Sequence, residues 1–208
     1  MFLIIVGSGA MGQLIKSCAE VDSFFDEIVV VEPLSNNWPT RKADLIIDFS
    51  HPKAVKSIYD YCRERGGSIP VIMGTTGQGN EEEAVLELLE KICPVVRKSN
   101  FSKGIEAMNY LVAEANKTIE KSDIVVEETH HIKKIDSPSG TAKTLCQILG
   151  VPFEQAISLR MGTVPGEHRV CFAMDDEVLE IRHVAYSKKI FALGAIEEGK
   201  ELIKNIKS

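Results

Sequence analysis

The sequence predicts an α/β fold built on a parallel β-sheet. Short, continuous apolar runs recur through the first hundred residues, and each one ends in a glycine-rich or polar turn. Continuous runs, in contrast to alternating ones, are typical of strands covered by helices on both faces. Stretches of helix-forming composition follow most of the turns. The expected strands are 2–6, 28–31, 44–50, 70–73 and 94–98, and the expected helices are 13–20, 54–65 and 80–91.

The first expected strand runs directly into a glycine-rich turn, residues 7–12, with the spacing G-x-G-x-x-G. Gly7 permits a tight turn, Gly9 lets the backbone approach a pyrophosphate, and Gly12 lets the next helix pack closely on the strand. A fortuitous glycine turn is a weak alternative because a strand precedes the motif and a helix follows it. The pattern predicts a dinucleotide-binding domain. The residues expected in its phosphate loop are Gly7, Ser8, Gly9, Ala10, Met11 and Gly12.

A carboxylate follows the second expected strand. Glu32 lies twenty positions after Gly12, where a carboxylate is expected to accept hydrogen bonds from ribose hydroxyls. Such a carboxylate repels a 2′-phosphate, and residues 33–35 supply no arginine. We therefore expect NADH to be favoured. NADPH use stays open, because a loop could bring Arg41 and Lys42 near the same position.

Polar and glycine residues end three further strands of the expected sheet. In open parallel sheets the ligand lies outside the carboxyl ends of the strands, so these residues are expected to face the cofactor. For residues 74–77 an ordinary strand-to-helix turn is the alternative. The expected cofactor-binding residues of this group are Ser50, Gly74, Thr75, Thr76, Ser99, Asn100 and Phe101.

Titratable side chains gather later in the chain, after a β-rich stretch. His130, His131 and Lys134 precede Ser139-Gly140-Thr141, which opens an apolar, helix-like stretch. Cationic groups next to a helix N-terminus make an anion site, because the first-turn N–H groups are unpaired and the helix dipole favours negative charge there. An imidazole or an amine can also deliver a proton. The segment therefore predicts an enzyme site for a carboxylate ligand, in preference to a solvated basic loop.

Composition argues against several other classes of protein. A net charge of −6 disfavours a nucleic-acid-binding protein, which needs a basic face. The five cysteines are scattered, so we expect neither a disulfide framework nor a zinc site, and a reduced, cytoplasmic setting fits best. The apolar start is too short for a signal segment, and no membrane association is expected. We also expect no metal, because the sequential carboxylates of Glu81–Glu83 suit a helix first turn better than one ion.

Together these motifs resemble the dihydrodipicolinate reductase family, also called the 4-hydroxy-tetrahydrodipicolinate reductase family. The chain departs from the family pattern in being short between Glu32 and Asp44, and in carrying Ile132 and Lys133 where an arginine and a histidine are often found. The segment 130–142 is the most specific part of the resemblance. The matching segments are 7–12, 48–52, 74–77, 100–102, 128–134, 136–142, 166–168 and 191–195.

The resemblance implies two domains and an oligomer. Residues 1–101 and 188–208 would form a Rossmann-type dinucleotide-binding domain. Residues 102–187 would form a smaller α+β substrate-binding and tetramerisation domain with a mixed sheet, which implies a homotetramer. Independent support comes from the β-rich segments 170–174 and 178–184, which flank a polar turn and predict a hairpin.

The resemblance also implies an activity. The family transfers a hydride from NAD(P)H to dihydrodipicolinate or 4-hydroxy-tetrahydrodipicolinate, giving tetrahydrodipicolinate in lysine and diaminopimelate biosynthesis. It implies that His130 and Lys134 are the catalytic residues, and which of them donates the proton stays open. The substrate, a small dicarboxylate, would be bound by His131, Lys134, Ser139, Gly140 and Thr141.

Two alternatives remain. Another small imine or amino-acid dehydrogenase would share the glycine turn but has no need of Ser139-Gly140-Thr141 behind a histidine pair. A redox-sensing NAD(H)-binding regulator without turnover would need a DNA-binding or partner-binding module, and no basic patch for one is visible. His168, His183 and Arg160 are expected to be structural or surface residues, although the match at residues 166–168 leaves a position next to the active site open for His168, and Arg160 has a similar status.

Overall fold

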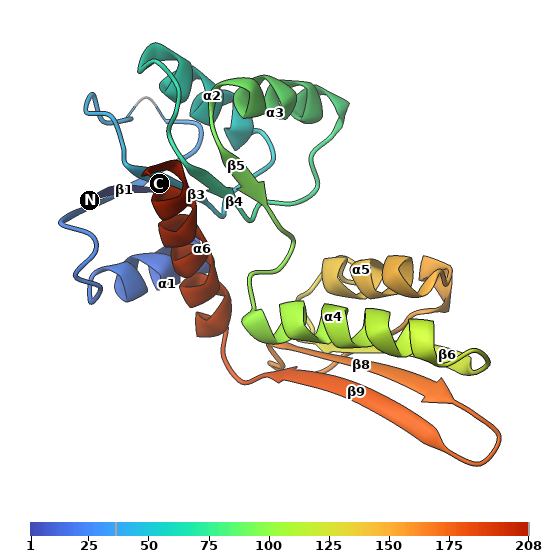
Figure 1. The fold of residues 1–208 in the computed structure, drawn as a ribbon. Coiled ribbons are helices and arrows are strands. Elements are labelled where there is room, and N and C mark those ends of the chain that lie inside the picture. The colour runs from blue at the N-terminus through green and yellow to red at the C-terminus, as the bar shows by residue number, and fades with distance from the viewer. Residues whose placement is uncertain (36, 208) are drawn as a thin grey trace. The chain divides into compact units, whose positions relative to one another are not determined.

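The computed structural model describes residues 1–35 and 37–207, without the side chain of Lys207. The chain forms two compact units (Figure 1). The first comprises Met1–Phe101 and the C-terminal segment from Phe191, and the second is Ser102–Ile190. The chain thus returns to the first unit slightly later than the predicted boundary at 187/188. Within the described residues, every helix is too short or too polar to cross a membrane.

The first unit contains a five-stranded sheet in which all neighbouring strands are parallel, in the order β2-β1-β3-β4-β5. The predicted parallel α/β fold is therefore confirmed for this unit. Its strands are β1 Phe2–Val6, β2 Glu27–Val31, β3 Leu45–Asp48, β4 Val71–Met73 and β5 Val95–Arg97. Its helices are α1 Ala10–Ala19, α2 Ala54–Glu64, α3 Asn80–Ile92 and the long C-terminal α6 Lys189–Lys207.

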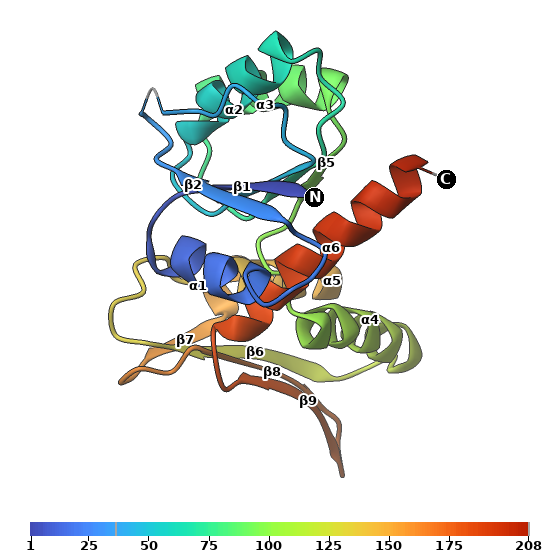
Figure 2. The same ribbon diagram turned by 90° about the vertical axis from the view of Figure 1, so that its left-hand side faces the viewer.

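Helices cover both faces of this sheet (Figure 2). Side chains alternate along a strand, so Phe2 and Ile4 pack against α2 and α3, whereas Leu3 and Ile5 pack against α1 and α6. All of β1 is fully buried. This two-sided burial is the physical reason why the strand reads as an uninterrupted apolar run. The parallel direction of the strands places the turns that follow them at one edge of the sheet.

The second unit contains a four-stranded mixed sheet in the order β7-β6-β8-β9. Strand β7 pairs parallel with β6, and the other pairs are antiparallel, including the predicted hairpin of β8 and β9. The strands are β6 Asp123–His130, β7 Ile157–Arg160, β8 Gly166–Ala173 and β9 Val178–Ala185. The helices are α4 Lys103–Thr118, α5 Gly140–Leu149 and the short 3-10 helix η1 Phe153–Gln155. Neither α4 nor β7 was predicted from the sequence.

The two faces of the second sheet have different environments. Val126, Val170 and Phe172 pack with α4 and α5 into a core, which Figure 1 shows on one side of the sheet. The opposite face, here called the open face, presents the alternate side chains of the strands of this sheet. Among them, Ile157 and Leu159 are each 46% exposed. The site described below lies on the helix-covered face.

Candidate active site

The glycine turn of the first unit connects β1 to α1. Gly7 has φ +103°, and a Cβ atom on it would lie 2.7 Å from the carbonyl oxygen of Phe49. A Cβ atom on Gly12 would lie 1.8 Å from the carbonyl oxygen of Gly7. A Cβ atom on Gly9, in contrast, meets nothing within 4 Å. The fold therefore requires glycine at the first and last positions, and the middle glycine leaves open space beside the backbone.

Helix α1 begins at this turn with exposed backbone. Gly9 is its N-cap, with no side-chain cap and no acidic residue in the first turn. The first N–H groups of a helix lack intrahelical acceptors, and the dipole makes this end positive. Ser8 and Ala10 are exposed, whereas Met11 packs against the core. The arrangement fits the pyrophosphate of a dinucleotide, which backbone N–H groups would bind.

The turns after β3 and β4 are joined by hydrogen bonds. The Ser50 hydroxyl donates to the buried Asp48 carboxylate, the Ser50 N–H donates to Thr75 Oγ1 at 2.8 Å, and the Gly74 N–H donates to the Asp48 carbonyl at 2.8 Å. Burial raises the pKa of Asp48 to about 6, although hydrogen bonds from Ser50 and Thr75 oppose the shift. Thr76 is exposed. These contacts fix the carboxyl edge of the sheet.

The segment after β5 joins the same edge. Ser99 is exposed, but the Phe101 side chain lies in the core, with its ring centroid 5.6 Å from that of Phe49. A Cβ atom on Gly194 of α6 would lie 1.8 Å from the Phe101 carbonyl oxygen, so α6 packs directly on this segment. The Phe101 side chain therefore packs inside the unit, and Ser99 presents a polar side chain at its surface. Asn100 lies between them and is partly buried.

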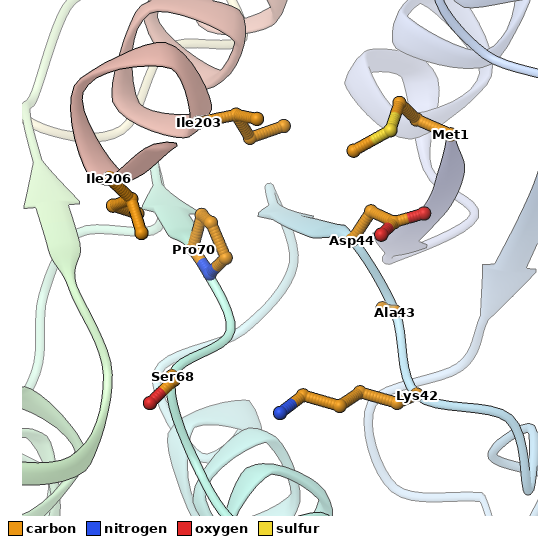
Figure 3. A pocket seen from close by; sticks show the side chains of 8 residues that line it. All are labelled: Met1, Lys42, Ala43, Asp44, Ser68, Pro70, Ile203 and Ile206. Carbon is orange, nitrogen blue, oxygen red and sulfur yellow. The ribbon is translucent and has the colours of Figure 1, made fainter. Parts of the chain in front are cut away.

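Arg41 and Lys42, the basic residues that could bind a 2′-phosphate, lie near the amino ends of the strands, away from Glu32. Glu32 follows the last residue of β2 and is exposed, but Arg41 pairs with Glu27, the first residue of the same strand. Glu27 and Glu32 are five residues apart along this extended segment, which separates them by about 16 Å. Lys42 lines a cavity of about 250 Å³ that contains none of the predicted site residues (Figure 3). The other lining residues are Met1, Ala43, Asp44, Ser68, Pro70, Ile203 and Ile206.

Strand alternation assembles the site of the second unit. Glu128 and His130 are two positions apart on β6 and therefore project from the helix-covered face. The register places His168 of β8 beside Glu128, and Arg160 of β7 beside His130. Glu128 and His130 thus lie on the same face of β6 as the core residue Val126.

Glu128 is the most connected side chain of this cluster. Its carboxylate is fully buried and accepts hydrogen bonds from Arg160 Nη2 at 2.9 Å, Arg160 Nη1 at 3.1 Å and the Ser139 N–H at 3.2 Å. It is also hydrogen-bonded to His130 Nδ1. Burial alone would raise the pKa of Glu128, but the hydrogen bonds from His130 and Arg160 hold it at about 2. The carboxylate is therefore ionised at neutral pH.

Arg160 also fixes the loop that carries Lys134. Its guanidinium donates to the Lys134 carbonyl at 3.3 Å and to the Asp136 carbonyl at 2.6 Å. Lys134 Nζ lies 2.7 Å from Asp136 Oδ1. Burial raises the pKa of Asp136, but this contact with Lys134 outweighs it and the pKa is lowered overall. His131 is partly exposed, and burial together with the nearby charge of Lys188 lowers its pKa.

The N-terminus of α5 is held from inside the unit. Ser139 is 2% exposed, and its Oγ caps the helix by accepting from the Ala142 N–H at 3.2 Å. The same Oγ lies 3.2 Å from His168 Nε2. Burial, and then the charge of His130, lower the pKa of His168 to about 3, so this imidazole is neutral. The Ser139 side chain is thus engaged in the fold, and Gly140 begins the first turn of the helix.

The structure adds residues to the predicted site that were not assigned to it from the sequence. His130 and Ser139 both bind Glu128, which the sequence analysis did not single out. His168 is buried, with its ring centroid 5.2 Å from that of His130, and Arg160 belongs to the same cluster. The spacing of two between Glu128 and His130 on a strand was a usable signal. Among the described residues, no group of His, Cys, Asp and Glu is arranged to hold a metal ion.

Family comparisons cover both units. Residues 1–101 match the family described as dihydrodipicolinate reductase, N-terminus, and residues 104–207 match dihydrodipicolinate reductase, C-terminus. The chain belongs to the dihydrodipicolinate reductase family. The resemblance seen in the sequence is therefore confirmed along almost the whole chain.

Individual members of the dihydrodipicolinate reductase family agree with this assignment. The 4-hydroxy-tetrahydrodipicolinate reductase of Brachyspira hyodysenteriae is 32% identical, with 98% of this chain and 94% of the relative covered. The enzyme of the same name from Thermosipho africanus is 35% identical, with 97% and 91% covered. A dipicolinate-bound dihydrodipicolinate reductase structure from Paenisporosarcina sp. TG-14 superposes with a TM-score of 0.74 at 20% identity, covering 98% of this chain and 95% of that one. The structural match supports the predicted fold class.

Proposed function

We propose that this chain reduces dihydrodipicolinate, derived from 4-hydroxy-tetrahydrodipicolinate, to tetrahydrodipicolinate with NAD(P)H, as a step of lysine and diaminopimelate biosynthesis. The observation that carries the proposal is the combination, in one unit, of His130, the Lys134 loop and the N-terminus of α5, organised around Glu128. A dicarboxylate needs cationic and N–H donors, and reduction of a cyclic imine leaves an electron-rich ring that must be protonated. The cluster offers both kinds of group.

In the first unit, the backbone of residues 7–12 and the first turn of α1 would hold the cofactor pyrophosphate. The nicotinamide cofactor, when bound, supplies the hydride. The proposed cofactor-binding residues at the carboxyl edge are Glu32, Ser50, Gly74, Thr75, Thr76, Ser99, Asn100 and Phe101. Ser50 and Thr75 act there by fixing the turns, because each hydroxyl already has a partner inside the unit.

NADH is the proposed preferred cofactor. Glu32 is exposed just beyond β2, where its carboxylate would accept hydrogen bonds from ribose hydroxyls and repel a 2′-phosphate. Arg41 pairs at the opposite end of that strand, and Lys42 lines the cavity away from this edge. NADPH is proposed as the weaker alternative.

In the second unit, the substrate carboxylates are proposed to bind His131, Lys134, and the N–H groups of Gly140 and Thr141. Ser139 would contribute indirectly, because its hydroxyl caps α5 and contacts His168. His130 and Lys134 are the two candidates to protonate the reduced ring. The His130 ring is held through Nδ1 by its hydrogen bond with the buried Glu128 carboxylate.

The chain is further proposed to act as a homotetramer through the second unit. The open face of its sheet carries Val125, Ile157 and Leu159 as exposed apolar side chains, which a subunit contact would bury. Equilibrium sedimentation tests this proposal. A cytoplasmic location stays a prediction from the sequence.

The activity is tested with purified protein and substrate generated in place from pyruvate and aspartate semialdehyde by the preceding synthase. We expect substrate-dependent loss of the nicotinamide absorbance, faster with NADH than with NADPH. His130→Ala and Lys134→Ala should each reduce turnover by about 100-fold or more while NADH binding is retained. Tight NADH binding without any oxidation would contradict the proposal and favour the regulator without turnover.

A further inference from the structure

The buried carboxylate of Glu128 connects three parts of the second unit. It binds the His130 ring on its own strand, the guanidinium of Arg160 on β7, and the backbone N–H of Ser139 at the start of α5. Through Arg160 it is also linked to the carbonyls of Lys134 and Asp136. His130 and Ser139 therefore contact Glu128 directly, and the Lys134 loop is one contact away through Arg160.

The neighbouring residue shows how unusual this position is. Glu127 pairs with Arg169 at 2.9 Å on the open face, with side chains that are 23% and 35% exposed. The Glu128 side chain is 0% exposed, and that of Arg160 is 19% exposed. A buried ion pair gives little net stability compared with apolar packing, because desolvation offsets the attraction. Stability alone therefore does not explain why the Glu128 carboxylate is buried on the helix-covered face.

We propose that Glu128 is a positioning residue of the reaction, which holds the His130 ring through Nδ1 so that Nε2 is the nitrogen that meets the substrate. This inference rests on the proposed function. Gly166 supports it from the other side of the ring, because a Cβ atom there would lie 3.0 Å from His130 Nε2. The glycine keeps side-chain atoms away from the nitrogen that Glu128 leaves free.

The chemistry of the contact sets the state of the ring. A carboxylate that accepts a hydrogen bond from Nδ1–H fixes the tautomer of a neutral imidazole and stabilises the imidazolium. The guanidinium of Arg160 keeps Glu128 itself ionised, so the proton stays on the ring. The Ser139 N–H completes the donors around the carboxylate and ties the ring to the helix terminus proposed to bind a substrate carboxylate.

A double-mutant cycle tests whether Glu128 acts through His130. Glu128→Gln should lower kcat by about 100-fold in the parent chain but by only about threefold in a His130→Gln background. KM should change less than kcat, and NADH affinity should stay within about twofold, since the cofactor is proposed to bind the other unit. Glu114→Gln, which removes an exposed carboxylate from an ion pair on α4, is the matched control and should leave kcat unchanged.

Equal losses of kcat in the two backgrounds would overturn the inference, because a merely structural role does not depend on His130. Glu128→Gln leaves Arg160 with fewer acceptors and can fail to fold, so a measurement on the unchanged protein is needed as well. Nitrogen-15 spectra of labelled histidine at alkaline pH, assigned with His130→Gln, should show His130 protonated at Nδ1. A proton at Nε2 instead would also overturn the inference.

The two failures can be told apart. A parent chain that does not oxidise NADH with the imine substrate overturns the proposed function, and the histidine tautomer then decides this inference by itself. A parent chain that is active, but shows no coupling between Glu128 and His130, overturns this inference and leaves the proposed function intact.

Discussion

The two candidate sites are built from different kinds of chemical group. In the first unit the candidate site is a backbone surface, formed by Gly9 and the N-terminus of α1, with open space beside it for a ligand. In the second unit the candidate site is a network of buried side chains, in which His130 and Arg160 contact the negative charge of Glu128. Added side-chain atoms should therefore weaken ligand binding at the backbone site. Removal of a charged group should destabilise the charge network. The expected effects below run from the largest to the smallest.

Two glycine substitutions separate the fold from the ligand in the backbone site. Gly12→Val should lower the melting temperature and abolish NADH binding, because its Cβ would lie 1.8 Å from the Gly7 carbonyl oxygen. Gly9→Ala should lower the melting temperature far less than Gly12→Val, since its Cβ meets nothing within 4 Å, yet weaken NADH binding by about 100-fold. Calorimetry and fluorescence titration measure the two properties. Normal NADH affinity in Gly9→Ala would show that the open space is not where the cofactor lies.

Two neighbouring carboxylates test the charge network. Glu128→Ala should lower the free energy of unfolding by about 3–5 kcal/mol, because it leaves Arg160 without its buried partner. Glu127→Ala removes a partly exposed carboxylate from an otherwise similar pair and should cost about 0–1 kcal/mol. Urea unfolding followed by circular dichroism compares them. Similar losses for the two variants would contradict the distinction between the faces of β6.

Acid should weaken the same network. The folded-state pKa of Glu128 is about 2, below its ordinary value of 4.5. Its contribution to stability is therefore complete above about pH 4.5 and is lost as the pH falls from there towards 2. The unfolding free energy of the parent chain should decrease over this interval more steeply than that of Glu128→Gln. Parallel pH profiles for the two proteins would rule out this linkage.

The smallest expected effect concerns cofactor choice. Glu32→Ser should shift the ratio of kcat/KM for NADH over NADPH by about tenfold towards NADPH, because the repulsive carboxylate is removed. Glu27→Ser, at the other end of β2, is the control and should leave the ratio unchanged. Initial rates with each cofactor give the ratio. A change of the same size in both variants would attribute the shift to net charge and not to position.

The contrast between the sites also explains what could be predicted from the sequence. The glycine turn has a fixed spacing along the chain, so Gly7, Gly9 and Gly12 were identified with their separate roles before the fold was known. Arg160 could not be assigned, because its role depends on the pairing of β7 with β6, which brings together residues far apart in the chain. Strand alternation could have placed Glu128 on the same face as His130. It could not have shown that Glu128 is buried, because that depends on α5 covering the face.

Ser139 shows a further limit of sequence reasoning. Its position before Gly140 correctly marked the start of a helix. The sequence did not indicate that its hydroxyl would be engaged by the Ala142 N–H and by His168. Motif matching identifies the residues of a site, and hydrogen bonding across strands decides which of their atoms can reach a ligand.

The most direct test is to follow the hydride itself. NADH carrying deuterium at both C4 positions would be supplied with the imine substrate, and the product analysed by mass spectrometry. The proposed reaction predicts a tetrahydrodipicolinate that is heavier by one carbon-bound deuterium in the parent chain, and far less of it from Glu128→Gln. Oxidation of NADH with no deuterium in that product, or no oxidation at all, would contradict the proposed reduction.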